Sequence, residues 1–387
     1  MRATCALLFA AIVGASVATA QEKPPLAQYT GWITALAFSP DGATLAAVGG
    51  QSLLYRPGTV KLWDPKTGQE KRALDGHASA VWCVAYSPDG KLLATGSYDH
   101  QIKLWDLEKM AERATLAGHK NWVTGLAFAP DGLTLASSSE DGTARFWDVA
   151  AAQQKAIIEP AHAGMIRGLA YSPDGKLLAT AGSDKLVKVW DTGNNTEKFK
   201  LEGHTEPVWS VAFSADGQTL ASAGGDRSIK LWDVASGANK ATLTGHTNWI
   251  TTVRFSPTGQ QLASAGYDRS IRFWDATNGA PGPVLYGNKS TIWALAYAPD
   301  GKLLASGSQS DSLRIWDLAS MSQTLGPELA PPPPEPKPAE QAPAEPKPED
   351  KPAEAAPAEE KPAEPKPEEK PAAEKPAEPK PDPNPPA

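Results

Sequence analysis

Short apolar runs separated by turn residues make up most of the chain, and one segment shows the pattern without interruption. Residues 80–86 and 92–97 are apolar runs, residues 101–105 alternate between polar and apolar side chains, and residues 113–116 form a fourth short run. Runs of this length predict four short strands. The first two are joined by a Ser-Pro-Asp-Gly turn at 87–90, where proline presets φ and glycine supplies the positive φ that closes the turn. We therefore predict a four-stranded antiparallel sheet.

This pattern recurs along the chain with a fixed period. A Trp-Asp dipeptide occurs seven times at spacings of 42 or 43 residues, and turns of the Ser-Pro-Asp-Gly type recur with it. Such a period indicates one repeated supersecondary unit, too small to bury its own apolar faces. Seven such sheets are satisfied by radial packing around an axis, so the predicted fold class is all-β, a seven-bladed β-propeller. The dipeptides begin at Trp63, Trp105, Trp147, Trp190, Trp232, Trp274 and Trp316.

Five units share a further set of four residues. Each has a histidine before the first strand, a Ser or Thr on the second strand, an Asp in the next turn and the dipeptide Trp six residues after that Asp. With these motifs, residues 23–325 resemble the WD-repeat β-propeller family, as an exported bacterial type with a C-terminal tail. The resemblance implies that the four groups form a structural hydrogen-bond network within each blade. The sets are His77, Thr95, Asp99 and Trp105; His119, Ser137, Asp141 and Trp147; His162, Thr180, Asp184 and Trp190; His204, Ser222, Asp226 and Trp232; and His246, Ser264, Asp268 and Trp274.

The His, Ser or Thr, and Asp of each set also look like a catalytic triad. A triad needs one nucleophile aimed at a cleft, and a set repeated five times around a ring cannot make five active sites. We therefore interpret these residues as structural. Such a buried network stabilises the fold only when it is complete, because an orphaned partner costs on the order of 1–3 kcal/mol.

The first and last units depart from the pattern. Tyr29 occupies the His slot of the first unit, and an insertion around residues 52–57 replaces its Asp turn. In the last unit Asn288 stands in place of the His and Ser310 in place of the Asp. Atypical terminal repeats are common in repeat proteins, and here they flank the seam where the ring closes.

Two segments compete to supply the outer strand of the last blade. Residues 24–26 align with the outer strand of a regular unit, and residues 323–325 follow the last Trp-Asp pair directly. We favour the N-terminal segment.

The remaining six tryptophans fall in two columns, three and five residues after the His slot. Positions two apart on a strand face the same way, so these side chains should form a ring near the central opening. In propellers of the resembled family this rim, together with the residue before the turn Asp, commonly forms the partner-binding face. The two columns supply Trp32, Trp82, Trp122, Met165, Arg167, Trp209, Trp249 and Trp293, and the resemblance adds Tyr98, Glu140, Ser183, Gly225 and Tyr267.

Two interpretations of this aromatic ring are open. The six indoles could pack on one another and plug the channel, or they could anchor a partner. A cation among aromatic faces suits recognition better than packing, so Arg167 favours the second interpretation.

The N-terminus has the layout of a secretory signal peptide. Arg2 precedes an apolar run over residues 6–18, and small residues lead to Ala20, after which we place the cleavage site. The run is shorter than the roughly 20 residues that a membrane span needs, so no transmembrane span is expected after cleavage. Cys5 would be removed with this segment, and Cys83 lies alone in an apolar strand, so we interpret it as a small core residue.

The C-terminal segment 331–387 is built from Pro, Ala, Glu and Lys. It has 21 prolines, 8 lysines and 14 acidic residues and no aromatic residue. Such a sequence cannot bury enough surface to fold, and its prolines favour an extended polyproline II chain of about 175 Å at most. We predict a disordered spacer or tether that could contact the cell envelope or cell wall. The domains are thus a signal peptide (1–20), a propeller (21–330) and a tail (331–387).

The middle part has no chemistry that marks an enzyme. Its formal net charge is −2, without the basic patch that binds nucleic acid. We find no metal-ligand spacing, phosphate loop or unique nucleophile, so no cofactor and no metal are expected. The leading hypothesis is a monomeric, secreted or periplasmic, non-catalytic scaffold that binds a protein or peptide at the rim. The alternatives are a small ligand or glycan at the same rim and, less favoured, an enzyme with a site in the central channel.

Overall fold

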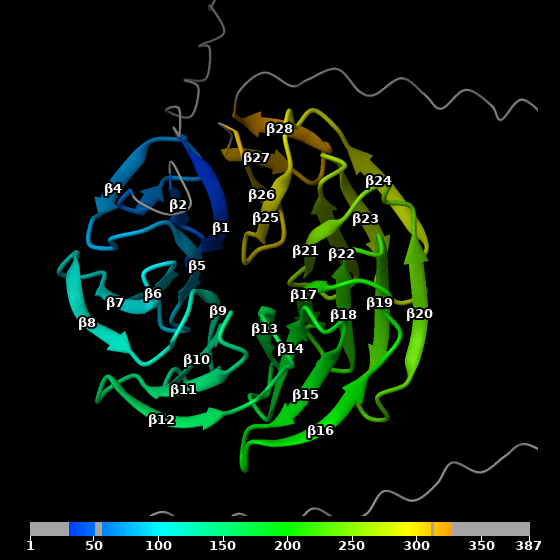
Figure 1. Cartoon of the computed structure of the whole chain (residues 1–387). Helices are drawn as coiled ribbons and strands as arrows, with labels where there is room; N and C mark the ends of the chain where they lie inside the picture. Colours follow the sequence, from blue (N-terminus) through cyan, green and yellow to red (C-terminus); the bar gives the residue numbers. More distant parts are fainter. Residues whose placement is uncertain (1–30, 51–55, 311–312, 327–387) are drawn as a thin grey trace, which may run out of the picture. The chain divides into compact units, whose positions relative to one another are not determined.

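The computed structural model describes residues 31–50, 56–310 and 313–326. These residues form seven four-stranded antiparallel sheets arranged around a central opening (Figure 1). The all-β, seven-bladed prediction is confirmed. The described part of the chain contains no helix, and hence none that could span a membrane. The predicted signal peptide (1–20) and tail (331–387) lie outside the described residues.

Each blade is formed by four strands that are consecutive in the sequence. Blade 1 comprises β1 (Trp32–Phe38), β2 (Leu45–Gly50), β3 (Thr59–Trp63) and β4 (Glu70–Leu74). Blade 2 comprises β5 (Val81–Tyr86), β6 (Leu92–Ser97), β7 (Gln101–Asp106) and β8 (Ala111–Ala117). Blade 3 comprises β9 (Val123–Phe128), β10 (Thr134–Ser139), β11 (Ala144–Asp148) and β12 (Gln153–Ile158). Blade 4 comprises β13 (Ile166–Tyr171), β14 (Leu177–Gly182), β15 (Val187–Asp191) and β16 (Thr196–Leu201).

The other three blades follow the same plan. Blade 5 comprises β17 (Val208–Phe213), β18 (Thr219–Gly224), β19 (Ser228–Asp233) and β20 (Asn239–Thr244). Blade 6 comprises β21 (Ile250–Phe255), β22 (Gln261–Gly266), β23 (Ile271–Asp275) and β24 (Pro281–Leu285). Blade 7 comprises β25 (Ile292–Tyr297), β26 (Leu303–Ser308), β27 (Leu313–Asp317) and β28 (Ser322–Leu325). The first strand of each blade lies nearest the central opening and the fourth lies at the periphery (Figure 1).

Burial changes across each blade in a way that the sequence pattern explains. The second strands, such as β14 and β18, are buried along their whole length. The fourth strands are mostly exposed and polar, but each buries one apolar residue that closes the edge of the core. These residues are Leu74, Leu116, Ile158, Leu201, Leu243, Leu285 and Leu325.

The hydrophobic cores lie between blades. Trp105, the dipeptide Trp of blade 2, packs with Val60 and Leu62 of blade 1. The seam is closed in the same way, because Ile33 of blade 1 lies in one cluster with Ile315 of blade 7. Each sheet therefore buries its two apolar faces against its two neighbours, as the radial prediction requires.

The outer strand of the last blade comes from the C-terminal side, so the prediction that favoured the N-terminal segment is wrong. Leu325 pairs with Ile315, and Gln323 pairs with Trp316. Residues 24–26 lie outside the described part of the chain. The strand that directly follows β27 reaches this edge through a short turn, and its Leu325 fills the place that the alignment had offered to Leu26.

The predicted four-residue sets are hydrogen-bonded in all five blades. In blade 2 the Trp105 indole N–H donates to Thr95 Oγ1 (2.8 Å), which lies 2.8 Å from His77 Nε2, and His77 Nδ1 lies 2.9 Å from Asp99 Oδ2. With the imidazole proton on Nδ1, the hydroxyl donates to Nε2 and every polar atom is satisfied. Asp99 Oδ2 also accepts the backbone N–H of Ala78 (3.0 Å). The relay thus ties two strands, β6 and β7, the turn between them and the segment before β5 into one unit.

The other four sets repeat these distances. The His Nδ1 to Asp distances are 2.7–3.0 Å, the His Nε2 to hydroxyl distances are 2.7–2.8 Å, and the indole to hydroxyl distances are 2.8–2.9 Å. The same geometry in five blades indicates that the four-residue sets have a structural role.

The two blades at the seam lack the complete relay. In blade 1, Ala47 occupies the hydroxyl position, and the buried Trp63 indole N–H has no hydrogen-bond partner among the described residues. In blade 7, the Trp316 indole donates to Ser306 Oγ (2.9 Å). The buried Asn288 amide that replaces the histidine has no partner within the described ranges. Tyr29 lies outside the described residues.

This contrast isolates the worth of one hydrogen bond. Trp105→Phe removes the indole N–H that Thr95 accepts, whereas Trp63→Phe removes an equally buried indole whose N–H has no partner. We expect Trp105→Phe to lower the free energy of unfolding by about 1 kcal/mol more than Trp63→Phe does. Urea denaturation of both variants and the parent measures the difference. Equal losses would show that the relay adds nothing to packing.

Acid should weaken the relays. Burial tends to raise the pKa of Asp226, but the hydrogen bond and charge of His204 outweigh it and lower the pKa to about 2. A carboxyl whose folded-state pKa is depressed stabilises the fold above its unfolded pKa and loses that contribution as the pH falls through the folded value. Burial also lowers the pKa of His119, so protonation of the unfolded chain below its ordinary pKa acts in the same direction.

We therefore expect the free energy of unfolding to fall between about pH 4 and about pH 2. Asp226→Asn should be less stable than the parent at pH 7, and its difference from the parent should shrink across that window. Urea denaturation at a series of pH values gives both curves. Parallel curves for parent and variant would remove Asp226 as a contributor to acid unfolding.

Candidate functional site

A repeated backbone hydrogen bond brings the candidate residues together at one end of the blades. In six blades a backbone N–H donates at 2.9–3.0 Å to the carbonyl of the residue three positions after the histidine position. The donor is the residue before the turn Asp, or the residue that aligns with it in blade 7. Tyr98 is joined in this way to Ala80, Glu140 to Trp122, Ser183 to Met165, Gly225 to Pro207, Tyr267 to Trp249 and Gln309 to Thr291. We call this end of the propeller the rim.

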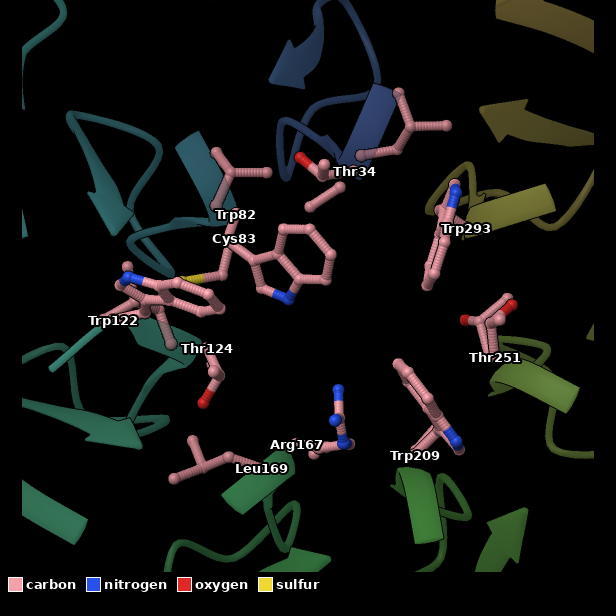
Figure 2. A pocket seen from close by; sticks show the side chains of 18 of the residues that line it. Thr34, Trp82, Cys83, Trp122, Thr124, Arg167, Leu169, Trp209, Thr251 and Trp293 are labelled. Carbon is pink, nitrogen blue, oxygen red and sulfur yellow. The ribbon is translucent and has the colours of Figure 1, made fainter. Parts of the chain in front are cut away.

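The residues five after the His slot form a complete ring inside the rim. Figure 2 shows their side chains around a central cavity, one from the first strand of each blade. They are Thr34, Trp82, Thr124, Arg167, Trp209, Thr251 and Trp293. Four of the seven are thus aromatic or cationic, and the other three are threonines.

The three threonines of this ring each bond to the next blade. Thr34 Oγ1 donates to the carbonyl of Val81 (2.6 Å), in the next blade around the ring. Thr124 and Thr251 donate in the same way to Ile166 (2.5 Å) and Ile292 (2.5 Å). These three blades carry their tryptophan two residues earlier, at the rim. The fifth position therefore locks two blades together in three blades, projects an indole in three, and projects the Arg167 guanidinium in blade 4.

All the rim aromatic side chains except Trp32 contact one another in a continuous chain. The ring centroids of Tyr98 and Trp122 lie 3.9 Å apart, and Trp82 contacts both Tyr98 (5.4 Å) and Trp293 (5.7 Å). Beyond Trp293 the chain continues through Trp209 and Tyr267, and both of these contact Trp249. Edge and tilted packing of this kind stabilises aromatic pairs by about 0.5–1.5 kcal/mol each.

Arg167 is held against this chain. Its Cζ lies 3.9 Å from the ring centroid of Trp209, a cation–π contact, and its buried Nε has no hydrogen-bond partner among the described residues. Burial lowers the pKa of Arg167, and the nearby Glu140 carboxylate opposes that shift. Burial together with Glu140 raises the pKa of Tyr98 to about 12. Glu140 is therefore the counter-charge of Arg167.

The rim residues differ in exposure. Trp249 is 45% exposed, and the other five tryptophans of the two columns are half-buried, as are Met165, Arg167, Glu140 and Tyr267. Tyr98 is buried. Glu140 and Trp249 lie outside the cavity wall, as do Ser183 and Gly225, whereas the other candidates line it.

The indoles do not fill the central opening. A cavity of about 520 Å³ remains inside the ring. Below the ring it is lined by small and apolar residues of the innermost strands, among them Gly125, Gly168 and Leu169. Mutual packing of the indoles and an open cavity are therefore both present.

The cavity wall also contains residues that the sequence patterns did not single out, among them the polar Gln309 and Arg254. Gln309 lines the cavity at the position that Tyr98 occupies in blade 2. This position is identified by the turn Asp that follows it, and in blade 7 Ser310 replaces that Asp. Arg254 lies deeper, eight residues after the His slot, where the other six units have alanine. An arginine in a column of alanines was a readable signal, but only the tryptophan columns were compared.

Metal ligands and the free cysteine can be assessed directly in the described residues. Within them, no group of three or more His, Cys, Asp or Glu side chains could hold a metal ion. Cys83 is buried, and desolvation raises the pKa of its thiol. Its sulfur lies 3.6 Å from the carbonyl oxygen of Val123 and packs in the core between blades 2 and 3.

Comparison with known proteins agrees with the repeat pattern. A family model described as "WD domain, G-beta repeat" matches residues 23–64, 68–106 and 111–148. A second model, described as "IFT122 first beta-propeller", matches residues 165–326. No curated protein matches the chain.

Proposed function

We propose that this seven-bladed β-propeller, which is built from WD40 repeats, is a non-catalytic scaffold that binds a protein or peptide through its rim. WD40 propellers are commonly protein-interaction scaffolds and are generally not catalysts. The observation that carries the proposal is the exposure of Trp249 beside an aromatic-walled cavity.

The energetics of such a rim favour recognition. An aromatic side chain presents 150–250 Å² in full, and apolar burial gives about 25 cal/mol per Å², so covering even half of a large aromatic side chain contributes about 2–3 kcal/mol. Residues of this kind dominate protein interfaces as hot spots when a ring of neighbours excludes water from them. Trp249 contacts both Trp209 and Tyr267, and the three present such a cluster at one side of the rim.

Export and tethering complete the proposal. The signal peptide predicted over residues 1–20, with cleavage after Ala20, would place the propeller in the periplasm or outside the cell. The tail predicted over residues 331–387 would act as a spacer or tether to another surface of the envelope.

A small ligand or glycan at the same rim is the second candidate. The cavity volume of about 520 Å³ lies within the roughly 300–1,000 Å³ of small-molecule pockets. Trp82, Trp209 and Trp293 present indole faces around that cavity, and indoles stack on sugars (Figure 2). Glycan-array binding without a protein partner would favour this candidate.

Site-specific photocrosslinking tests the rim as an interface. A benzophenone amino acid in place of Trp249 should capture a discrete protein in the native envelope. The same residue in place of Leu133, which is 67% exposed but lies beyond the opposite end of β9 from the rim, should not capture it. Combining the probe at 249 with Trp82→Ala and Trp209→Ala should abolish the adduct, because hot-spot losses of 2 kcal/mol or more weaken binding about 30-fold.

The melting temperature of each variant is the control for folding. An adduct that survives both alanine substitutions would count against the rim. A large fall in melting temperature with the adduct retained would make the indoles a structural plug.

A further inference from the structure

One position on the innermost strands breaks an otherwise uniform column. Eight residues after the His slot, six units have alanine: Ala37, Ala85, Ala127, Ala170, Ala212 and Ala296. The one remaining unit, blade 6, has Arg254 on β21, three residues beyond the Thr251 of the inner ring. At about 3.3 Å per residue the two positions lie roughly 10 Å apart along the strand, and both line the same cavity.

The Arg254 guanidinium donates only some of its hydrogen bonds to other protein groups. Nη1 donates to the backbone carbonyl of Val253 (2.7 Å) and to Ser210 Oγ (3.3 Å). A guanidinium has five N–H donors, so three remain, on Nε and Nη2, and no described residue accepts from them. The side chain is accessible to solvent and lines the cavity wall. The Nε and Nη2 edge of the guanidinium is therefore left without a protein acceptor among the described residues.

No acidic side chain balances this charge. The cavity wall contains two arginines, Arg167 and Arg254, and no Asp or Glu among the described residues. Arg167 has Glu140 beside it, whereas the pKa of Arg254 is lowered by desolvation with no opposing carboxylate. Arginine nonetheless stays protonated in proteins, so the cavity holds an uncompensated cation.

Folding does not require that cation. Alanine fills the same place in six blades, so packing at this position does not demand a guanidinium. The open fork suits a carboxylate, because its two oxygens accept two parallel N–H bonds from one guanidinium. Ser210, whose hydroxyl accepts from Arg254 Nη1, also lines the cavity.

We propose that the central cavity is a carboxylate-binding site in which Arg254 pairs with an acidic group inserted past the aromatic ring. This inference rests on the proposed function and names the chemistry of its ligand. The preferred source is an Asp or Glu side chain of an extended peptide segment in the partner. A free organic acid would use the same contacts.

Peptide selection tests the site directly. The full chain, immobilised, is used to select from a displayed library of random twelve-residue peptides. The expected result is a set of peptides with Asp or Glu at one fixed position together with apolar residues for the indoles. A synthetic peptide from this set should lose at least about 30-fold in affinity when that acid is changed to Asn or Gln.

Protein variants supply the second half of the cycle. Arg254→Ala installs the residue that the other blades carry, so its melting temperature should match that of the parent. It should bind the acidic peptide at least about 30-fold more weakly and the amide peptide as the parent does. Arg254→Lys keeps the charge but not the fork and should fall between the two. Arg113→Ala, on the exposed strand β8, changes the net charge equally and should leave binding unchanged.

Small probes distinguish the source of the carboxylate. Tryptophan fluorescence is titrated with glutarate, glutaramide and inorganic phosphate. Glutarate binding that depends on Arg254, with no peptide selected, would support the carboxylate site but contradict the protein-binding function. Selected peptides without an acidic preference, bound equally by Arg254→Ala, would overturn the carboxylate site and leave the proposed function standing. Arg254-dependent binding of phosphate in preference to glutarate, or no binding of any probe, would also overturn the site.

Discussion

The structure depends on the sharing of one hydrophobic core between every two neighbouring blades. A single four-stranded sheet has two apolar faces and can bury neither alone, so each dipeptide tryptophan packs against the blade before it, as Trp105 packs on Val60 and Leu62. The hydrogen-bond relay from indole to hydroxyl, imidazole and carboxylate then fixes the strands around that tryptophan. The central cavity exists because seven units of this size close a ring whose innermost strands carry mostly small residues below the rim.

The rim combines packing with openness. Its indoles touch in a chain from Trp122 to Trp249, which orders them at little entropic cost to a later ligand. The hydroxyls of the three inner-ring threonines donate to backbone carbonyls of the next blade. The residues five after the histidine position thus supply both contacts between blades and part of the aromatic surface. The two interpretations of the aromatic ring, a plug and a binding surface, are therefore compatible, because the indoles contact one another and still leave the cavity open.

Periodicity made most of the fold readable from sequence. Turn residues and the Trp-Asp period predicted the strands of blade 2 to within two residues at each end, and the His slot located both tryptophan columns. The segment that closes the ring could not be predicted from this period. Residues 24–26 and residues 323–325 both end in a leucine, the residue type that an outer strand buries. The deep part of the cavity was missed for a different reason. Arg254 differs from the alanines of its column, and only a comparison of every column, aromatic or not, would have exposed it.

The way the ring closes bears on how such a protein can be rearranged. Blade 1 is made entirely from one end of the described chain and blade 7 entirely from the other, and side chains around Ile33 and Ile315 pack across the seam between them. No sheet is shared across the seam, so each blade is a contiguous cassette. Circular permutation at any inter-blade connection would preserve all seven sheets, and duplication or loss of a blade would leave its neighbours' strand order intact.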